Sequence, residues 1–159
     1  MSDIVMHPIG IVHRPQSVPA ESGQYVDPRA DATIEIDPQW ADGLTGIEEY
    51  SHLVVVFALD RAPRRDPDVQ RQHPEGREDL PEVGFFATRA TSRPNPIALT
   101  CPRLLRREGN RLVVEGIDAW DGSPVIDIKG YTPRDESRPA ATVPAWLTRL
   151  WAIHDVERS

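Results

Sequence analysis

The feature that most constrains the fold is an unbroken apolar run at residues 52–59, HLVVVFAL. Its β-branched and aromatic residues are typical of a strand, and its continuous hydrophobicity predicts burial on both faces. Further segments have strand patterns and are separated by Gly, Pro, Asn and Asp turn signals. These segments are residues 9–13, 32–36, 83–88, 97–105, 111–117 and 125–129. We therefore expect a sheet in which the strand at residues 52–59 is central.

This pattern indicates a mainly β fold of about seven short strands, and it favours a single small β-barrel over a doubly wound sheet. Glu108-Gly109-Asn110 predicts a hairpin. Residues 61–81 are rich in charge and proline and lack periodicity, which predicts a long surface loop. Asp37 before Pro38 predicts a short helix. Apolar residues at helical spacing in 143–154 predict a C-terminal amphipathic helix that packs on the barrel or on a partner.

The length of 159 residues and the hydrophobic content of 39% predict one domain over residues 1–159. The sequence contains no apolar run long enough to span a bilayer, and its first residues lack the pattern of a signal peptide. We therefore expect a soluble, cytoplasmic protein with no membrane partner.

The lone Cys101 cannot form an internal disulfide and is expected in the core of an apolar strand. The histidines lie at no metal-ligand spacing, so we expect no metal site.

The formal net charge of −7 argues against a general nucleic-acid binder, because phosphate affinity requires clustered Lys and Arg. This net charge conceals a local basic stretch from Phe86 to Arg111, in which Glu108 is the only acidic residue. Acidic residues concentrate elsewhere in the sequence, so one face is able to attract an anion. The alternative is an arginine-rich, solvated pair of strands. The basic residues of this stretch are Arg89, Arg93, Arg103, Arg106, Arg107 and Arg111.

The segment at residues 85–97, FFATRATSRPNPI, contains two prolines that fix their own φ angles and restrict the residues before them. The resulting stiff loop presents Arg89, Arg93 and Asn95 with little entropy to lose on binding. Because guanidinium binds carboxylate or phosphate bidentately, the two arginines are candidates for orienting an anionic group. The alternative is a rigid turn whose side chains cap its own backbone.

The segment at residues 118–131, DAWDGSPVIDIKGY, contains a tight-turn signal at Asp121-Gly122, followed by a strand with Asp127 and Lys129 on one face. This arrangement gathers polar groups near one barrel mouth. The backbone of the turn, together with Asp118 or Asp121, is suited to hold the ribose hydroxyls or amino group of a nucleoside cofactor. The alternative is a hairpin with a surface Asp–Lys pair worth about 0–1 kcal/mol.

Both segments resemble motifs of one family. FATRATSRPNPIAL is similar to F-A-T-R-S-x-x-R-P-N-P-I-G, and DAWDGSPVIDIKGY is similar to D-L-x-D-G-T-P-V-x-D-I-K-P-Y. Upstream, IGIVHRP and GLTGIEEYSHLVVVF resemble the family patterns I-G-x-I-x-S-P and G-L-E-x-F-S-H-L-x-x-x-F. The chain thus resembles the TsaA-like (TrmO-like) S-adenosylmethionine-dependent methyltransferases over most of residues 8–133. The resemblance implies a β-barrel, a homodimer with the cofactor near the interface, and methylation of N6 of threonylcarbamoyladenosine in the tRNA anticodon loop.

The resemblance also implies residues that contact the cofactor. The catalytic candidates come from the residues themselves: Arg89, Arg93 and Asn95 of the stiff loop to orient the substrate, and Asp118 and Tyr131 for polar roles near the transferred methyl group. The chain departs from the family at residues 19–23, PAESG in place of P-R-Q-P-G, and at Ala98 and Gly130, where the family has glycine and proline. The residues implied to contact S-adenosylmethionine are Glu21, Ser22, Gly23, Leu59, Asp60, Arg89, Asp121, Gly122, Ser123 and Pro124.

Two other functions stay open at this point. A methyltransferase of the same fold that acts on a small metabolite fits the acidic net charge and the lack of a second domain. A regulatory protein that binds S-adenosylmethionine without catalysis is the alternative from a different functional class.

Overall fold

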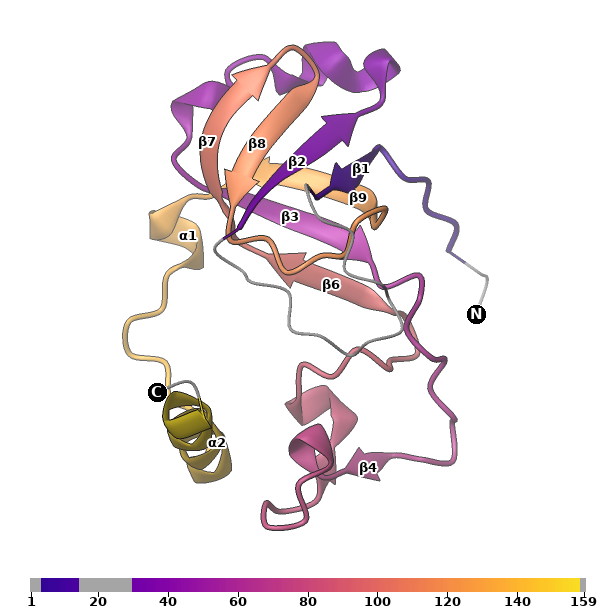
Figure 1. Ribbon diagram of the computed structural model, residues 1–159, viewed down its shortest axis with the longest axis vertical. Helices are drawn as coiled ribbons and strands as arrows, with labels where there is room; N and C mark the ends of the chain where they lie inside the picture. Colours follow the sequence, from indigo (N-terminus) through magenta and orange to yellow (C-terminus); the bar gives the residue numbers. More distant parts are fainter. Residues whose placement is uncertain (1–3, 15–29, 158–159) are drawn as a thin grey trace.

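The computed structural model describes residues 4–14 and 30–157, and within them the fold is mainly β (Figure 1). Seven strands form one antiparallel sheet in the order β6-β3-β9-β1-β2-β8-β7, and β4 and β5 form a separate pair. The strands of the large sheet are β1 (Gly10–His13), β2 (Asp31–Ile36), β3 (Leu53–Ala58), β6 (Ile97–Thr100), β7 (Arg103–Glu108), β8 (Arg111–Glu115) and β9 (Pro124–Gly130).

The apolar run that dominates the sequence forms β3, which pairs with β6 on one side and β9 on the other. Leu53, Val55 and Phe57 are fully buried in the main core, and Val54 on the opposite face is also buried. The strand is therefore interior, with a partner on each side as predicted, although it is second from one edge of the sheet and not at its middle. The inward side chains of the other strands complete the core, among them Val12, Ile34, Ile36, Leu112, Val114 and Val125.

The two edge strands of the sheet, β6 and β7, follow each other in the chain with only Cys101 and Pro102 between them. Pro102 O accepts a hydrogen bond from Leu53 N–H at 3.0 Å, and Ser51 O accepts one from Leu104 N–H at 2.9 Å. In Figure 1, β2, β7 and β8 run steeply across β3 and β6, so the sheet is strongly curved. These pairings establish a large antiparallel sheet, and its closure into a barrel stays a prediction.

Most strand predictions are confirmed to within two residues at each end. The single strand predicted at residues 97–105 is wrong at Cys101-Pro102, because the buried Pro102 has no N–H to donate to a ladder. The strand predicted at residues 83–88 is wrong after Gly84. There β5 (Val83–Gly84) gives way to a 3₁₀ helix, Phe85–Ala87, and Phe85 O accepts hydrogen bonds from the N–H and hydroxyl of Thr88 at 3.1 and 2.8 Å.

The predicted turns and short helices are confirmed where the sequence marks them. Gly109 adopts φ of 64° between β7 and β8, as a tight hairpin requires. Asp37 caps the 3₁₀ helix Pro38–Leu44, because its Oδ1 accepts from Gln39 N–H at 3.0 Å. A second 3₁₀ helix, Ile47–Glu49, follows it, and α1 (Pro133–Glu136) lies after β9. None of the helices in the described ranges is long and apolar enough to cross a membrane.

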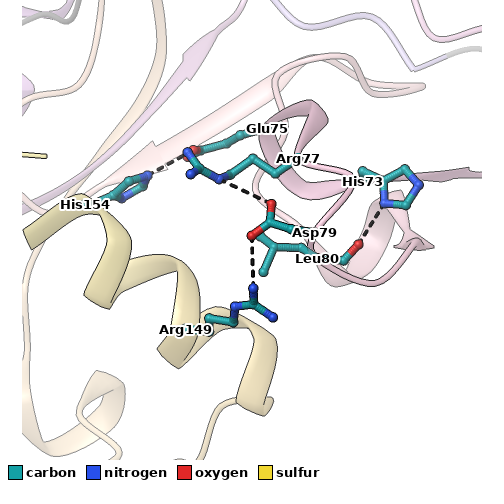
Figure 2. Close-up of polar contacts among 7 residues, drawn as sticks. All are labelled: His73, Glu75, Arg77, Asp79, Leu80, Arg149 and His154. Carbon is teal, nitrogen blue, oxygen red and sulfur yellow. Dashed lines mark hydrogen bonds and ion pairs between the residues drawn. The ribbon is translucent and has the colours of Figure 1, made fainter. Parts of the chain in front are cut away.

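The segment at residues 61–81 lies below the large sheet in Figure 1 and contains only β4 (Arg71–Gln72) and the 3₁₀ helix Pro74–Gly76. The C-terminal helix, α2 (Ala145–Glu157), lies beside it. Figure 2 shows two polar contacts between them: Arg149 Nη2 to Asp79 Oδ2 at 3.1 Å, and His154 Nε2 to Glu75 Oε2 at 2.9 Å. The helix prediction is confirmed, and these polar contacts tie the helix to the long loop rather than to the sheet.

Candidate functional site

A cavity of about 760 Å³ lies at the end of β3, where the chain leaves the sheet. Both segments singled out in the sequence contribute to its wall, together with β6 and the residues that follow β3. The lining comprises residues 59–63, 88–91, 97–101 and 118–120, with Phe57, Arg93 and Ser123. The fold therefore brings Leu59, Asp60, Arg89, Arg93, Asp118 and Ser123 to one site, although they are far apart in the chain.

Arg89 lies in the cavity wall with an exposed side chain. Its Nη2 donates to Leu99 O at 2.9 Å, which fixes the guanidinium against β6. Among the residues that the structure describes, this is the one hydrogen bond that its side chain makes. The remaining donors of the guanidinium are available to an anionic group in the cavity.

Asp60 and Arg61 place opposite charges on the cavity wall directly after the strand β3. Arg61 Nε lies 4.0 Å from Asp60 Oδ2, and Arg61 Nη2 donates to Asp121 O at 3.0 Å. Arg61 thus connects the end of β3 to the turn that precedes β9. Asp118 is exposed on the same wall and adds a second carboxylate.

Arg93 also lines the cavity, but its guanidinium is occupied by the loop that carries it. Its Nη1 lies within hydrogen-bonding distance of Thr88 O at 3.1 Å, Ala90 O at 3.4 Å and Phe85 O at 3.5 Å. The alternative interpretation of this segment, a rigid turn whose side chains cap its own backbone, is therefore correct for Arg93. Arg93 fixes the backbone on either side of Arg89 rather than reaching freely into the cavity.

The turn at residues 121–124 is anchored to β1. Asp121 Oδ1 accepts from Arg14 N–H at 2.8 Å, Gly122 N–H donates to Val12 O at 2.8 Å, and Val12 N–H donates to Ser123 O at 3.0 Å. Gly122 has φ of 83°, which favours glycine. Within this turn, Ser123 is buried and lines the cavity, whereas Asp121, Gly122 and Pro124 do not. The carboxylate of Asp121 accepts the hydrogen bond from Arg14 N–H and does not line the cavity. Asp121 contacts the cavity wall only through its backbone oxygen, which accepts from Arg61.

Other predicted site residues are not brought into this cavity. Asn95 is exposed in the stiff loop, outside the lining. Tyr131 packs edge-on against His52 with ring centroids 6.3 Å apart, near the start of β3, and is not part of the lining. Asp127 and Lys129 form the expected surface ion pair. The predicted cofactor residues Glu21, Ser22 and Gly23 lie outside the described residues.

Three residues that were not predicted give the cavity wall much of its character: Arg61, Trp120 and Leu99. Arg61 belongs to the long loop and was hidden by its many charged neighbours. Trp120 and Leu99 are 40% and 49% exposed and give the cavity an apolar surface. The available signal was Trp120 itself, because an aromatic residue between two aspartates next to a turn has little reason to be there for packing alone.

Cys101 corrects a further expectation. It was predicted to be a core residue of a continuous strand, but the strand breaks beside it and leaves its side chain exposed at the cavity. Partial burial raises the pKa of the Cys101 thiol, the carboxylate of Glu136 raises it further, and the Arg89 guanidinium opposes them. The thiol is therefore present mostly in its protonated form at neutral pH.

Most arginines of the basic stretch are paired with carboxylates outside the cavity. Arg107 Nη1 lies 3.3 Å from Glu48 Oε2, and Arg111 Nη2 lies 2.8 Å from Glu35 Oε2. Arg103 and Arg106 are paired with Glu115 and Glu108 in the same way. The alternative interpretation, a solvated pair of strands, therefore describes these four residues. Of the basic stretch, Arg89 and Arg93 line the cavity, where they join Arg61.

Comparisons with known proteins agree with the motifs that form this cavity. The sequence profile of the tRNA-methyltransferase O N-terminal domain matches residues 11–137. An S-adenosyl-L-methionine-binding protein from Archaeoglobus fulgidus is 43% identical over 133 residues, which are 82% of this chain and 91% of the relative.

Solved structures give the same result. The crystal structure of TrmO from Pseudomonas aeruginosa superimposes with a TM-score of 0.68 at 31% identity, and another crystal structure of TrmO superimposes with 0.68 at 29%. Each match covers 91% of this chain, but the chain spans only 62% and 63% of the two solved proteins. The matched profile and the shared fold both include the segments that line the cavity, and the chain belongs to the family of the tRNA-methyltransferase O N-terminal domain.

Proposed function

We propose that the chain is an S-adenosylmethionine-dependent methyltransferase that acts on N6 of threonylcarbamoyladenosine in the tRNA anticodon loop. The observation that carries the proposal is the cavity at the end of β3, in which the two family motifs meet. The name of the Archaeoglobus fulgidus relative supports the cofactor, and the identity of the solved proteins as TrmO supports the tRNA substrate.

The residues of the cavity fit the functional groups of this cofactor. Its carboxylate needs a cationic partner, for which Arg89 has free donors. Its ammonium group and ribose hydroxyls need acceptors, and the carboxylate of Asp60 lies on the same wall. Its adenine needs an apolar or aromatic surface, which Leu99 and Trp120 provide. Each group of the cofactor therefore has a chemically suited residue within one cavity.

When bound, S-adenosylmethionine supplies a methyl carbon on a positively charged sulfur; transfer forms the N6–carbon bond, breaks the carbon–sulfur bond and releases the N6 proton. The contribution of the chain is mainly alignment in a site with little water. In our proposal Arg89 orients a carboxylate, and Arg93 holds the loop that positions Arg89. Asp118 is the carboxylate that we assign to accept the released proton, because it is exposed on the cavity wall.

The finer structural expectations belong to this proposal. Closure of the sheet into one barrel domain is supported by the consecutive edge strands β6 and β7 and by the isolated bridge between His52 and Arg103. A homodimer is supported by exposed apolar residues of α2, such as Trp151 and Val156. A location in the cytoplasm follows from a tRNA substrate. We leave Asn95 and Tyr131 out of the proposed catalytic residues, because neither lines the cavity.

The test is to incubate the full chain with S-adenosylmethionine and unmethylated tRNA that carries threonylcarbamoyladenosine. We expect the mass of that nucleoside to increase by one methyl group, and tRNA with unmodified adenosine is the control. Calorimetry in the presence of a chelator measures cofactor binding separately. Cofactor binding with methylation of a small metabolite alone contradicts the tRNA assignment, and binding with no turnover on either substrate pool supports the regulatory alternative.

A further inference from the structure

A second cavity of about 690 Å³ adjoins the first and has a different character. Among the residues that the structure describes, its lining includes three arginines, two phenylalanines, three prolines and Gln70, and no Asp or Glu. We call it the arginine–phenylalanine pocket, after Arg64, Arg65, Arg93, Phe85 and Phe86. In a chain with a net charge of −7, a pocket whose described charged residues are all arginines favours anions.

Two of the three arginines are held in place by the protein. Arg65 Nε donates to Val69 O at 2.8 Å, its Nη1 donates to Gln72 Oε1 at 2.5 Å, and its guanidinium lies 4.7 Å above the Phe85 ring. Arg93 is held by the carbonyls of its own loop. These partners are neutral, so they orient the two guanidinium groups without cancelling their charge.

The third arginine, Arg64, is free to bind. Its side chain is exposed, and among the residues that the structure describes it has no hydrogen bond or ion pair. It therefore brings a full positive charge and unused donors to a pocket whose other cations are already fixed. A phosphate group at this position is attracted by all three charges.

Phe86 adds an aromatic surface to this positive field. It is 75% exposed, its ring centroid lies 4.2 Å from that of the buried Phe85, and the Arg93 guanidinium lies 5.8 Å from its ring. The Phe85 ring supports Phe86 on one side, and most of the Phe86 side chain stays open to solvent. An exposed aromatic ring beside arginines that face no carboxylate in the pocket is a combination with which proteins bind unpaired nucleotides.

We propose that the arginine–phenylalanine pocket binds a nucleotide of single-stranded RNA next to the nucleotide that is methylated, with its base stacked on Phe86 and its phosphate at Arg64. The identity of the strand rests on the proposed function. The two cavities are continuous along the chain: the segment after β3 passes from Ala62 and Pro63 in the first to Arg64 in the second, and Arg93 lines both. A strand that places one nucleoside in the first cavity has its neighbour beside this pocket.

The charge of the pocket is tested with the full chain and a fluorescent stem-loop RNA of anticodon-loop sequence, by anisotropy over a range of salt concentrations. We expect Arg64→Gln to weaken binding several-fold and to reduce the slope of log affinity against log salt by about 0.7, the value for one contact to a single strand. The matched control is Arg106→Gln, which removes the same charge from an arginine that is paired with Glu108 on β7. It leaves the affinity near that of the wild type.

The stacking is tested with Phe86→Leu, which keeps an apolar side chain but removes the ring. We expect RNA binding to weaken about fivefold or more, whereas Phe86→Tyr retains it. Trp40→Leu is the matched control, because Trp40 is an exposed aromatic residue on the 3₁₀ helix Pro38–Leu44, outside both cavities. Melting curves check that each variant is folded.

Calorimetry with S-adenosylmethionine separates this inference from the proposed function. If the wild type binds the cofactor while Arg64→Gln and Phe86→Leu bind RNA as well as the wild type does, the pocket is not an RNA site and only this inference fails. If the wild type does not bind the cofactor, the proposed function fails. Loss of affinity for inorganic phosphate in Arg64→Gln without any effect of Phe86→Leu on RNA also overturns the inference, since it identifies a simple anion site.

Discussion

Arg89 differs from most arginines near it in the partner of its guanidinium. Arg103, Arg106, Arg107 and Arg111 face carboxylates, whereas Arg89 donates to the backbone oxygen of Leu99. The sequence showed that Arg89 precedes the proline-stiffened loop, and it identified Arg89 as a candidate for orienting an anionic group. The sequence did not reveal which arginines are neutralised, because three of the four acidic partners are distant in the chain; only Glu108 lies on the same strand as its arginine.

We predict that Arg89→Ala reduces methyl transfer roughly ten- to a hundredfold and leaves the fold intact. The lost interaction is a charged hydrogen bond worth about 1.5–3 kcal/mol in binding, whereas the side chain is exposed and contributes little to the core. Activity and melting temperature are measured on the same preparation, with Arg106→Ala as the control. A variant that melts normally and methylates at the wild-type rate removes Arg89 from the site.

Cys101 offers a test of the cavity that does not depend on turnover. Because burial and Glu136 raise the pKa of the thiol, we predict slower alkylation at neutral pH than for free cysteine, with a rate that increases as the pH rises toward the raised pKa. Since Cys101 lines the cavity, S-adenosylmethionine should slow alkylation further. Cys101 is the only cysteine, so mass spectrometry follows one site, and Cys101→Ser is the blank. Unchanged labelling at saturating cofactor contradicts the assignment of the cofactor to this cavity.

At the scale of the elements, the hydrophobic pattern of the sequence predicted most strands. It failed where hydrogen bonds from side chains further along the chain fix the backbone. β3 was evident from its apolar residues alone. The 3₁₀ helix Phe85–Ala87 was not, because its backbone is held by Thr88 and by the guanidinium of Arg93, several residues further along the chain. The break at Pro102 was readable in principle, since a proline within an apolar run argues against a continuous strand.

We predict that Arg93→Ala loosens the loop at residues 85–93 in addition to any effect on binding. Removing the guanidinium leaves Thr88 O and Ala90 O without their donor, so the loop at residues 85–93 should loosen. Hydrogen exchange of this loop should accelerate, and the free energy of unfolding should fall by about 1–3 kcal/mol. Arg89→Ala is the comparison, because it changes binding without these effects. If Arg93→Ala exchanges like the wild type, Arg93 does not position the loop.

At the scale of the whole molecule, the acidic net charge and the two cavities have to be considered together. Carboxylates on the strands and turns neutralise the arginines of β7 and β8, while the cationic side chains that stay available lie in the loops below β3 and β6. The sequence average of −7 therefore describes the molecule poorly as a partner for RNA. No count of residues along the chain reveals this separation, because it arises from pairing across the sheet.

The last prediction is that the protein is a homodimer through α2. Trp151, which is 49% exposed, gives an apolar face to a helix whose polar contacts already tie it to residues 75 and 79 (Figure 2). A second copy is the occupant that the family resemblance implies for such a face. Ultracentrifugation at micromolar concentrations should show a dimer, and Trp151→Glu should shift it to a monomer, because association would bury an unpaired charge. Trp40→Glu, which places the same charge on the 3₁₀ helix Pro38–Leu44, should remain dimeric. If the wild type is a monomer at every concentration and still methylates tRNA, neither the dimer nor a cofactor site shared between subunits is required.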